Sequence, residues 1–238
     1  ILAEADLIGD RRRGHARRSY AVPRLVATGP NEVWSWDISR LRGPAVRVWF
    51  YLYVVLDIYT RKIVGWTIDH IESDKIAKRL ITRICQREGI SADQLVLHAD
   101  RGAQMTSNPI AELLEDLGVT RSFARPRTSD DNPYSEAAFK TVKYRPDYPA
   151  RFDSIDDART WMRRFVAWYN HDHYHSALGY LHPADVHARA CGPIIEARQN
   201  VLDAAYNAHP DRFRNKAPVA AGPPTEVWIN KPDIQTKT

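Results

Sequence analysis

The stretch VWSWDISRL, residues 33–41, alternates apolar and polar side chains with the period of two that is typical of a half-buried strand. Two longer runs follow, VRVWFYLYVVLDI at residues 46–58 and RKIVGWTIDH at residues 61–70, and both are rich in β-branched and aromatic residues. Short segments separate the three runs. The sequence therefore predicts three consecutive strands in an antiparallel meander, with Asp37 in the middle of the first.

Beyond residue 70 the apolar residues recur at helical spacing. Ser73 and Gly89 can begin and end one helix, and a second helix is expected over residues 108–118. The runs QLVLHA, residues 94–99, and VTRSFA, residues 119–124, predict two short strands that alternate with these helices. This order predicts an α/β fold with a mixed five-stranded sheet flanked by helices.

The two ends of the chain differ in texture from the part between them. We expect residues 1–30, with RRRGHARR at residues 11–18, to be a basic arm or linker; because the first residue is not Met, we expect it to be the end of a truncated N-terminal region. Residues 31–190 would form the main domain. Residues 191–238 would carry one helix and a Pro-rich tail with a short strand at EVWIN.

Composition favours a nucleic-acid partner. The 238 residues include 34 Lys and Arg against 29 Asp and Glu, a net charge of +5 that favours a polyanion. The two cysteines are too few for a disulfide framework or a Cys-rich zinc site. We see no signal peptide or long apolar span, so no membrane partner and a cytoplasmic location are expected.

Three carboxylates fall at positions where chemistry is expected. Asp37 lies in an apolar strand, where a carboxylate is costly unless it is paired, hydrogen-bonded or bound to metal. Asp100 ends the fourth strand in HADRGAQ, where Gly102 is expected to let the backbone turn sharply. Glu136 follows with 35 residues between it and Asp100, near the start of a helix. If the first and fourth strands are neighbours, these oxygen ligands suit two Mg²⁺ or Mn²⁺ ions. Spacing alone is weak evidence, and a strand Asp is often only a hydrogen-bond acceptor.

Four ordered motifs carry a family resemblance: WSWDI, HADRGAQMTS, DNPYSEAAFKTVK and YNHDHYHSALGYLHPADV. Between residues 31 and 190 the chain resembles the retroviral-integrase-type catalytic core of bacterial insertion-sequence (OrfB-like) DDE transposases, and PTEVWINKP resembles their C-terminal ends. Met105 and His173 depart from the commoner Tyr and Arg of the family.

The resemblance implies an RNase H-like fold, with Asp37, Asp100 and Glu136 as catalytic residues that hold two Mg²⁺ or Mn²⁺ ions. It implies a polynucleotidyl transferase that cleaves phosphodiesters at transposon ends and transfers the 3′-OH into target DNA. A homo-oligomer, a dimer or higher, would assemble on double-stranded DNA at the bacterial nucleoid. In the family, end recognition resides in a helix-turn-helix N-terminal to the core. Residues 1–30 show none, so it would lie in a missing upstream part or in a separate partner chain.

Candidate DNA contacts are basic or amide side chains near the motifs: Lys143, Lys140, Asn132, Gln104, Arg101, Arg127 and Arg125. Each has a structural alternative: Lys140 can pair with Glu136 one helical turn away, Asn132 can stabilise a turn, and Gln104 can fix its loop. Two other functions remain open: an RNase H-like nuclease, and a non-catalytic DNA-binding or regulatory fragment of a transposase.

Overall fold

The computed structural model describes residues 20–126, 128–213 and 216–232. The basic run at residues 11–18 and Arg127 lie outside these residues. None of the described helices is long and apolar enough to cross a membrane.

The predicted sheet is confirmed. Its strands are β2 (Val33–Arg42), β3 (Trp49–Asp57), β4 (Ile63–Asp69), β5 (Val96–Ala99) and β6 (Thr120–Phe123), in the spatial order β4-β3-β2-β5-β6. The meander β2-β3-β4 is antiparallel, and β5 and β6 run parallel to β2. The first and fourth predicted strands are therefore neighbours.

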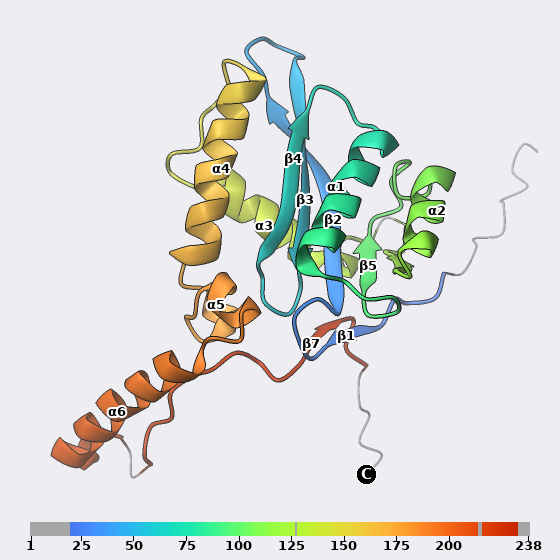
Figure 1. The fold of residues 1–238 in the computed structure, drawn as a ribbon. Coiled ribbons are helices and arrows are strands. Elements are labelled where there is room, and N and C mark those ends of the chain that lie inside the picture. Colours follow the sequence, from blue (N-terminus) through green and yellow to red (C-terminus); the bar gives the residue numbers. More distant parts are fainter. Residues whose placement is uncertain (1–19, 127, 214–215, 233–238) are drawn as a thin grey trace, which may run out of the picture.

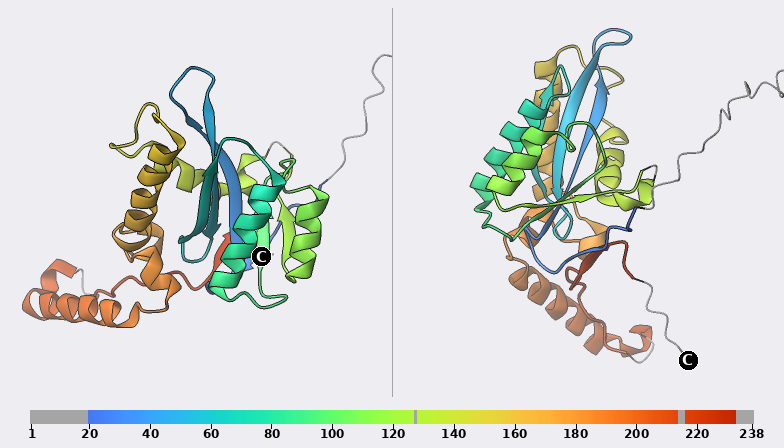
Figure 2. Two further views of the ribbon diagram at one scale, coloured as in Figure 1. Left: turned by 45° about the horizontal axis from the view of Figure 1, so that its top comes forward. Right: turned by 90° about the vertical axis from the view of Figure 1, so that its right-hand side faces the viewer.

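Helices cover both faces of this sheet (Figures 1 and 2). On one face lie α1 (Asp74–Glu88) and α2 (Asn108–Asp116), and on the other lie α3 (Pro133–Lys143) and α4 (Ile155–His171). The caps predicted for α1 form as expected: the Ser73 side chain accepts a hydrogen bond from Lys75 N, and Gly89 adopts the left-handed conformation with φ 63°.

The alternation in β2 divides its side chains between two cores. Trp34 and Trp36 are buried with α1 and α2, whereas Leu41 packs in the core that α3 and α4 cover. Burial of such large side chains contributes roughly 1.5–3 kcal/mol each. The polar residues Ser35 and Asp37 therefore face α3, which places them on the side from which a helical residue can reach them.

A second sheet joins the two ends of the described chain. Strand β1 (Leu25–Ala27), within the expected arm, pairs antiparallel with β7 (Val227–Ile229) in the expected tail (Figure 1). Both strands pack on Val33 and Ile58 of the main domain. Three-residue strands about 200 positions apart give no periodic signal in the sequence, and neither was expected to pair with the other.

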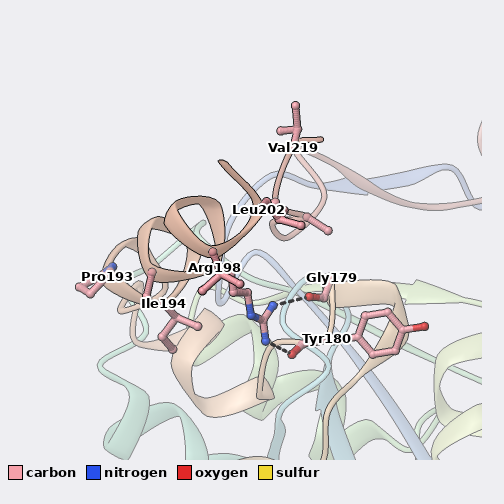
Figure 3. A pocket seen from close by; sticks show the side chains of 11 residues that line it. Gly179, Tyr180, Pro193, Ile194, Arg198, Leu202 and Val219 are labelled. Carbon is pink, nitrogen blue, oxygen red and sulfur yellow. Dashed lines mark hydrogen bonds between the residues drawn. The ribbon is translucent and has the colours of Figure 1, made fainter. Parts of the chain in front are cut away.

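The chain beyond α4 forms short helices and then a projecting one. After η2 (Ser176–Leu178) come α5 (Pro183–His187), α6 (Gly192–Ala208) and η3 (Pro210–Phe213). Helix α6 extends away from the sheet (Figure 1), and none of its residues is buried. An apolar pocket of about 850 Å³ lies along this helix. In this pocket Arg198 donates hydrogen bonds to the carbonyls of Gly179 and Tyr180 (Figure 3). It contains none of the three candidate carboxylates.

Candidate active site

Sheet register brings Asp37 and Asp100 together. Trp36 of β2 pairs with Ala99 of β5 in the parallel ladder, so Asp37 and Asp100 are the next residues along two adjacent strands. Neighbouring strands lie about 4.8 Å apart. Beyond Asp100 the chain turns at once, and Gly102 N donates to Asp100 O at 2.8 Å.

The expected reason for Gly102 does not hold in this structure. Gly102 is not among the residues with a left-handed backbone, and a Cβ added there would make an ordinary 3.5 Å contact with Gln104 Oε1. The turn after Asp100 therefore does not depend on the conformational freedom of glycine.

Helix α3 runs along the polar side of β2 and brings Glu136 to it. Ser35 Oγ donates to Asn132 Oδ1 at 2.5 Å, and Lys143 Nζ donates to Ser39 Oγ at 2.6 Å. Between these two bonds, Asp37 and Glu136 are near enough for the charge of Glu136 to act on Asp37. Ser35, Asp37 and Ser39, which alternate along β2, thus all face the same side of α3.

The pKa of Asp37 is raised by burial and by two neighbouring carboxylates. Burial, and after it the negative charges of Asp100 and Glu136, raise the pKa of Asp37 to about 7. The Ile38 N–H, which donates to Asp37 Oδ1 at 2.7 Å, and the Lys143 ammonium both act to lower this pKa. At neutral pH, Asp37 is therefore protonated in a large fraction of molecules unless a cation joins the site.

A small cavity of about 150 Å³ opens between Asp37 and Asp100, and it contains a fourth carboxylate, Glu72. Gln104 Nε2 donates to Glu72 Oε2 at 3.0 Å across this cavity. Sequence reasoning missed Glu72, although its position directly before the Ser73 helix cap places it at the end of the meander.

Asp37, Asp100 and Glu136 offer carboxylate oxygens, which are the ligands of hard divalent cations. A bound cation would also offset the repulsion that helps to raise the pKa of Asp37 to about 7. In the described ranges, no three His, Cys, Asp or Glu side chains stand as a ready metal site. The chemistry of Asp37, Asp100 and Glu136 therefore fits the metal, while the arrangement of their side chains is not that of a formed metal cage.

A polar cluster anchors the N-terminal end of α3, and sequence reasoning missed it. The buried His98 contacts the Asp131 carbonyl through Nε2 at 2.7 Å and Ser122 Oγ through Nδ1 at 2.9 Å. Arg125 donates to both oxygens of the Asp131 carboxylate and holds its pKa at about 2. Asn230, after β7, also donates to Asp131 Oδ1 at 2.8 Å. The C-terminal motif thus helps to position the helix that carries Glu136.

Among the expected DNA contacts, several side chains are engaged inside the protein. Asn132 is buried, with its amide bonded to Ser35 and to the Trp36 carbonyl, so it positions α3 and does not face solvent. Arg125 is bound to Asp131. The expectation that Asn132 contacts DNA is not supported by this burial.

The remaining candidates differ in exposure. Arg101 lies over the rings of Tyr20 and Phe123 and donates to the Ala124 carbonyl. Lys140 is exposed, and the ion pair with Glu136, which was the alternative to a DNA contact, is not formed in the described structure. Lys143 is also exposed, and its charge and that of Asp37 act on each other's pKa.

Fold and site together define a class of protein: an RNase H-like core in which carboxylates gather at adjacent strands and a facing helix. Two family models, each described as an integrase core domain, match residues 27–129 and 117–183. The simian T-cell lymphotropic virus intasome in complex with a PP2A regulatory subunit has the same fold, with a TM-score of 0.56 at 15% identity over 71% of this chain and 60% of that one. The HTLV-2 integrase catalytic core in complex with magnesium, in its trimeric form, gives a TM-score of 0.52 at 14% identity over 67% and 97%.

Two relatives in sequence show to which family within this class the chain belongs. The transposase for insertion sequence element IS904 of Lactococcus lactis is 31% identical over 173 residues, 70% of this chain and 67% of that protein. A putative transposase for IS986/IS6110 of Mycobacterium tuberculosis is 30% identical over 177 residues, 69% of this chain and 60% of that protein. The chain belongs to the insertion-sequence transposases with an integrase core domain. It spans about two thirds of the length of these relatives.

Proposed function

We propose that this chain is the catalytic part of a DDE transposase, which cleaves a phosphodiester at each transposon end and joins the freed 3′-OH to target DNA. The observation that carries the proposal is the register that sets Asp37 beside Asp100, with Glu136 on the facing helix and a pKa near 7 for Asp37. A site with this excess of negative charge is suited to a reaction assisted by divalent cations.

In this proposal Asp37, Asp100 and Glu136 hold two Mg²⁺ or Mn²⁺ ions. Such ions, when bound, stabilise the negative charge that develops on the attacking and leaving oxygens in phosphoryl transfer. The chain's own residues orient the reacting strand. Lys143, next to Asp37, would bind a phosphate of that strand, and its hydrogen bond to Ser39 Oγ holds the ammonium in place.

The partner is double-stranded DNA, both the transposon ends and the target, bound mainly through phosphates and therefore in a salt-dependent way. Lys140 and Gln104 are further candidate contacts, since Lys140 is exposed and Gln104 lines the cavity between the aspartates. Arg101 would contribute to the charge around the site, whereas Arg125 is bound to Asp131. Arg127 lies outside the described residues and stays a candidate contact. We further propose a homo-oligomer that pairs two DNA ends in the bacterial nucleoid.

The test is resealing of a branched DNA that mimics the strand-transfer product, because this reaction needs the catalytic core and little end recognition. We expect resealing with Mg²⁺ or Mn²⁺, none with chelator, and none with Asp37→Asn, Asp100→Asn or Glu136→Gln. DNA binding without metal-dependent chemistry in the wild type would favour the binding or regulatory fragment instead. Cleavage of an RNA–DNA hybrid without joining would favour the nuclease.

A further inference from the structure

Helix α1 carries a row of positive charge that the proposed chemistry does not use. Lys75, Arg79, Arg83 and Arg87 are all exposed and follow one another at intervals of four residues. Residues at this spacing are neighbours on a helix surface, and like charges there destabilise the helix. We call these four residues the α1 stripe. A row of like charges that is unfavourable for the helix itself points to an anionic partner.

The α1 stripe leads into a groove. Between α1 and α4, across the edge strand β4, lies a cavity of about 470 Å³ whose lining includes Lys62, Arg83, Arg87, Arg159 and Arg163. Figure 1 shows β4 between these two helices. Among the lining residues Glu88 is the one carboxylate, so five cations face one anion in this β4 groove.

The cations of the β4 groove are not all neutralised within the protein. Glu88 is shared by Lys62, Arg87 and His187, and Arg159 contacts Asp156. Neither Arg83 nor Arg163 forms an ion pair with another residue that the structure describes. One of these guanidinium groups lies on each wall, so each wall offers a cation to a polyanion in the groove.

The edge of the sheet in the groove is already occupied, which disfavours a peptide strand. Arg87 donates to the Val64 carbonyl and Arg159 to the Ile68 carbonyl at 2.9 Å. Asn170 pairs with both the N–H and the carbonyl of Ile63. Addition of a peptide strand needs free backbone groups along the edge. A second copy of this chain is disfavoured as well, because a two-fold contact across the groove would bring its five cations and one carboxylate against the same set of charges.

The other end of α1 reaches the candidate active site. Glu72, which lines the cavity between Asp37 and Asp100, directly precedes Ser73, the cap of α1. From Lys75 to Arg87 the helix rises about 18 Å. The stripe thus runs from the rim of the catalytic cavity to the β4 groove.

We propose that the α1 stripe and the β4 groove form a binding site for the phosphate backbone of DNA, in which DNA that leaves the catalytic cavity is held along α1 and between Arg83 and Arg163. This inference rests on the proposed function for its choice of DNA as the polyanion. It adds a second contact region at a distance of about five base pairs from the catalytic cavity, at 3.4 Å per base pair.

The experiment compares Arg83→Ala/Arg163→Ala with a control, Arg121→Ala/Arg164→Ala, which removes the same charge from exposed arginines outside the groove. Each protein is titrated with branched DNA whose arms are either four base pairs, closed by hairpin loops, or fifteen base pairs. Affinity is measured by fluorescence anisotropy over a series of salt concentrations, and folding is checked by thermal melting.

With long arms, we expect the groove variant to bind roughly tenfold or more weakly, since charged hydrogen bonds to phosphate are lost. Its plot of log K against log salt should be shallower by about two, one for each lost phosphate contact. The control variant should match the wild type, and short arms should show no such difference.

Equal affinity and equal salt slope for the wild type and the groove variant on long arms would overturn the groove site. The proposed function would still stand if the wild type reseals the branched DNA with Mg²⁺. A wild type that neither binds nor reseals branched DNA would instead overturn the proposed function. Binding of a poly-glutamate peptide that is lost in the groove variant, while DNA binding is kept, would assign the groove to a protein partner.

Discussion

The two sides of the candidate active site are held in different ways. On the α3 side, Asp131 receives hydrogen bonds from Arg125 and Asn230, and Asn132 is buried against Ser35. On the other side, Asp100 is exposed, and the loop after it is joined to the end of the meander through the bond from Gln104 to Glu72. The comparison teaches that folding fixes Glu136 more firmly than it fixes the segment that follows Asp100.

The largest effect is expected at the exposed side. Asp100→Asn removes one of the three proposed metal ligands and should reduce resealing by about a thousandfold or more, since metal-assisted charge stabilisation is worth several kcal/mol. Asp116→Asn, an exposed residue of α2, is the matched control and should leave the rate unchanged. A gel assay of branched-DNA resealing measures both, and equal rates would remove Asp100 from the mechanism.

The anchored side is tested by Asp131→Asn. This change weakens the charged hydrogen bonds from Arg125 and Asn230 and should lower the free energy of unfolding by about 2 kcal/mol. Resealing should fall with it, because Glu136 is carried by the helix that this cluster anchors. Asp130→Asn, one residue away and exposed, is the control, and urea denaturation is the measurement. An unchanged midpoint for Asp131→Asn would contradict the anchoring role.

The burial of Asp37, together with the carboxylates near it, predicts a pH-dependent stability. Because the pKa of Asp37 is raised from 3.8 to about 7, the folded state retains a proton that the unfolded chain loses. The resulting destabilisation is absent below pH 3.8, grows as the pH rises towards 7, and reaches at most about 4 kcal/mol above that.

Asp37→Asn should therefore be more stable than the wild type at pH 8 without metal and nearly equal to it at pH 4. Chemical denaturation at the two pH values measures the difference. A gap that is the same at both values would show that the pKa of Asp37 is not raised by folding.

The smallest effect is expected from the bond between Gln104 and Glu72 on the exposed side. Glu72→Gln keeps the size of the side chain and removes its charge, so the bond from Gln104 becomes a neutral one. Resealing should fall about twofold to tenfold, which corresponds to the loss of roughly 0.5–1.5 kcal/mol. Thermal melting should show little change, since Glu72 is exposed. A thousandfold loss would mean that Glu72 is itself a metal ligand.

The part of the fold that depends on local pattern could be predicted from sequence. These features include the alternation of VWSWDISRL, the caps at Ser73 and Gly89, and the order of strands and helices. Each depends on residues that are close together in the chain, so each can be predicted from the sequence alone. The sequence did not show that β2 and β5 are neighbours. The structure shows that they pair in parallel, which sets Asp37 beside Asp100.

The hydrogen bonds that could not be predicted from the sequence join residues that are far apart in the chain. The family resemblance made Asn132 a candidate DNA contact, with a role in a turn as the alternative, but its amide is bonded to a strand almost 100 positions earlier. Asn230 reaches Asp131 from the other end of the chain. Hydrogen bonds of this kind have no periodicity, so nothing in the residue pattern reveals them before the sheet is assembled.

The central claim is that Asp37, Asp100 and Glu136 form one site in which a divalent cation takes the place of a proton. Calorimetric titration with Mg²⁺ at pH 6 and pH 8, in buffers of different ionisation enthalpy, tests it most directly. We expect tighter binding at pH 8, release of close to one proton per site at pH 6, and loss of that release in Asp37→Asn. Binding with the same affinity and no proton release at both pH values would contradict it.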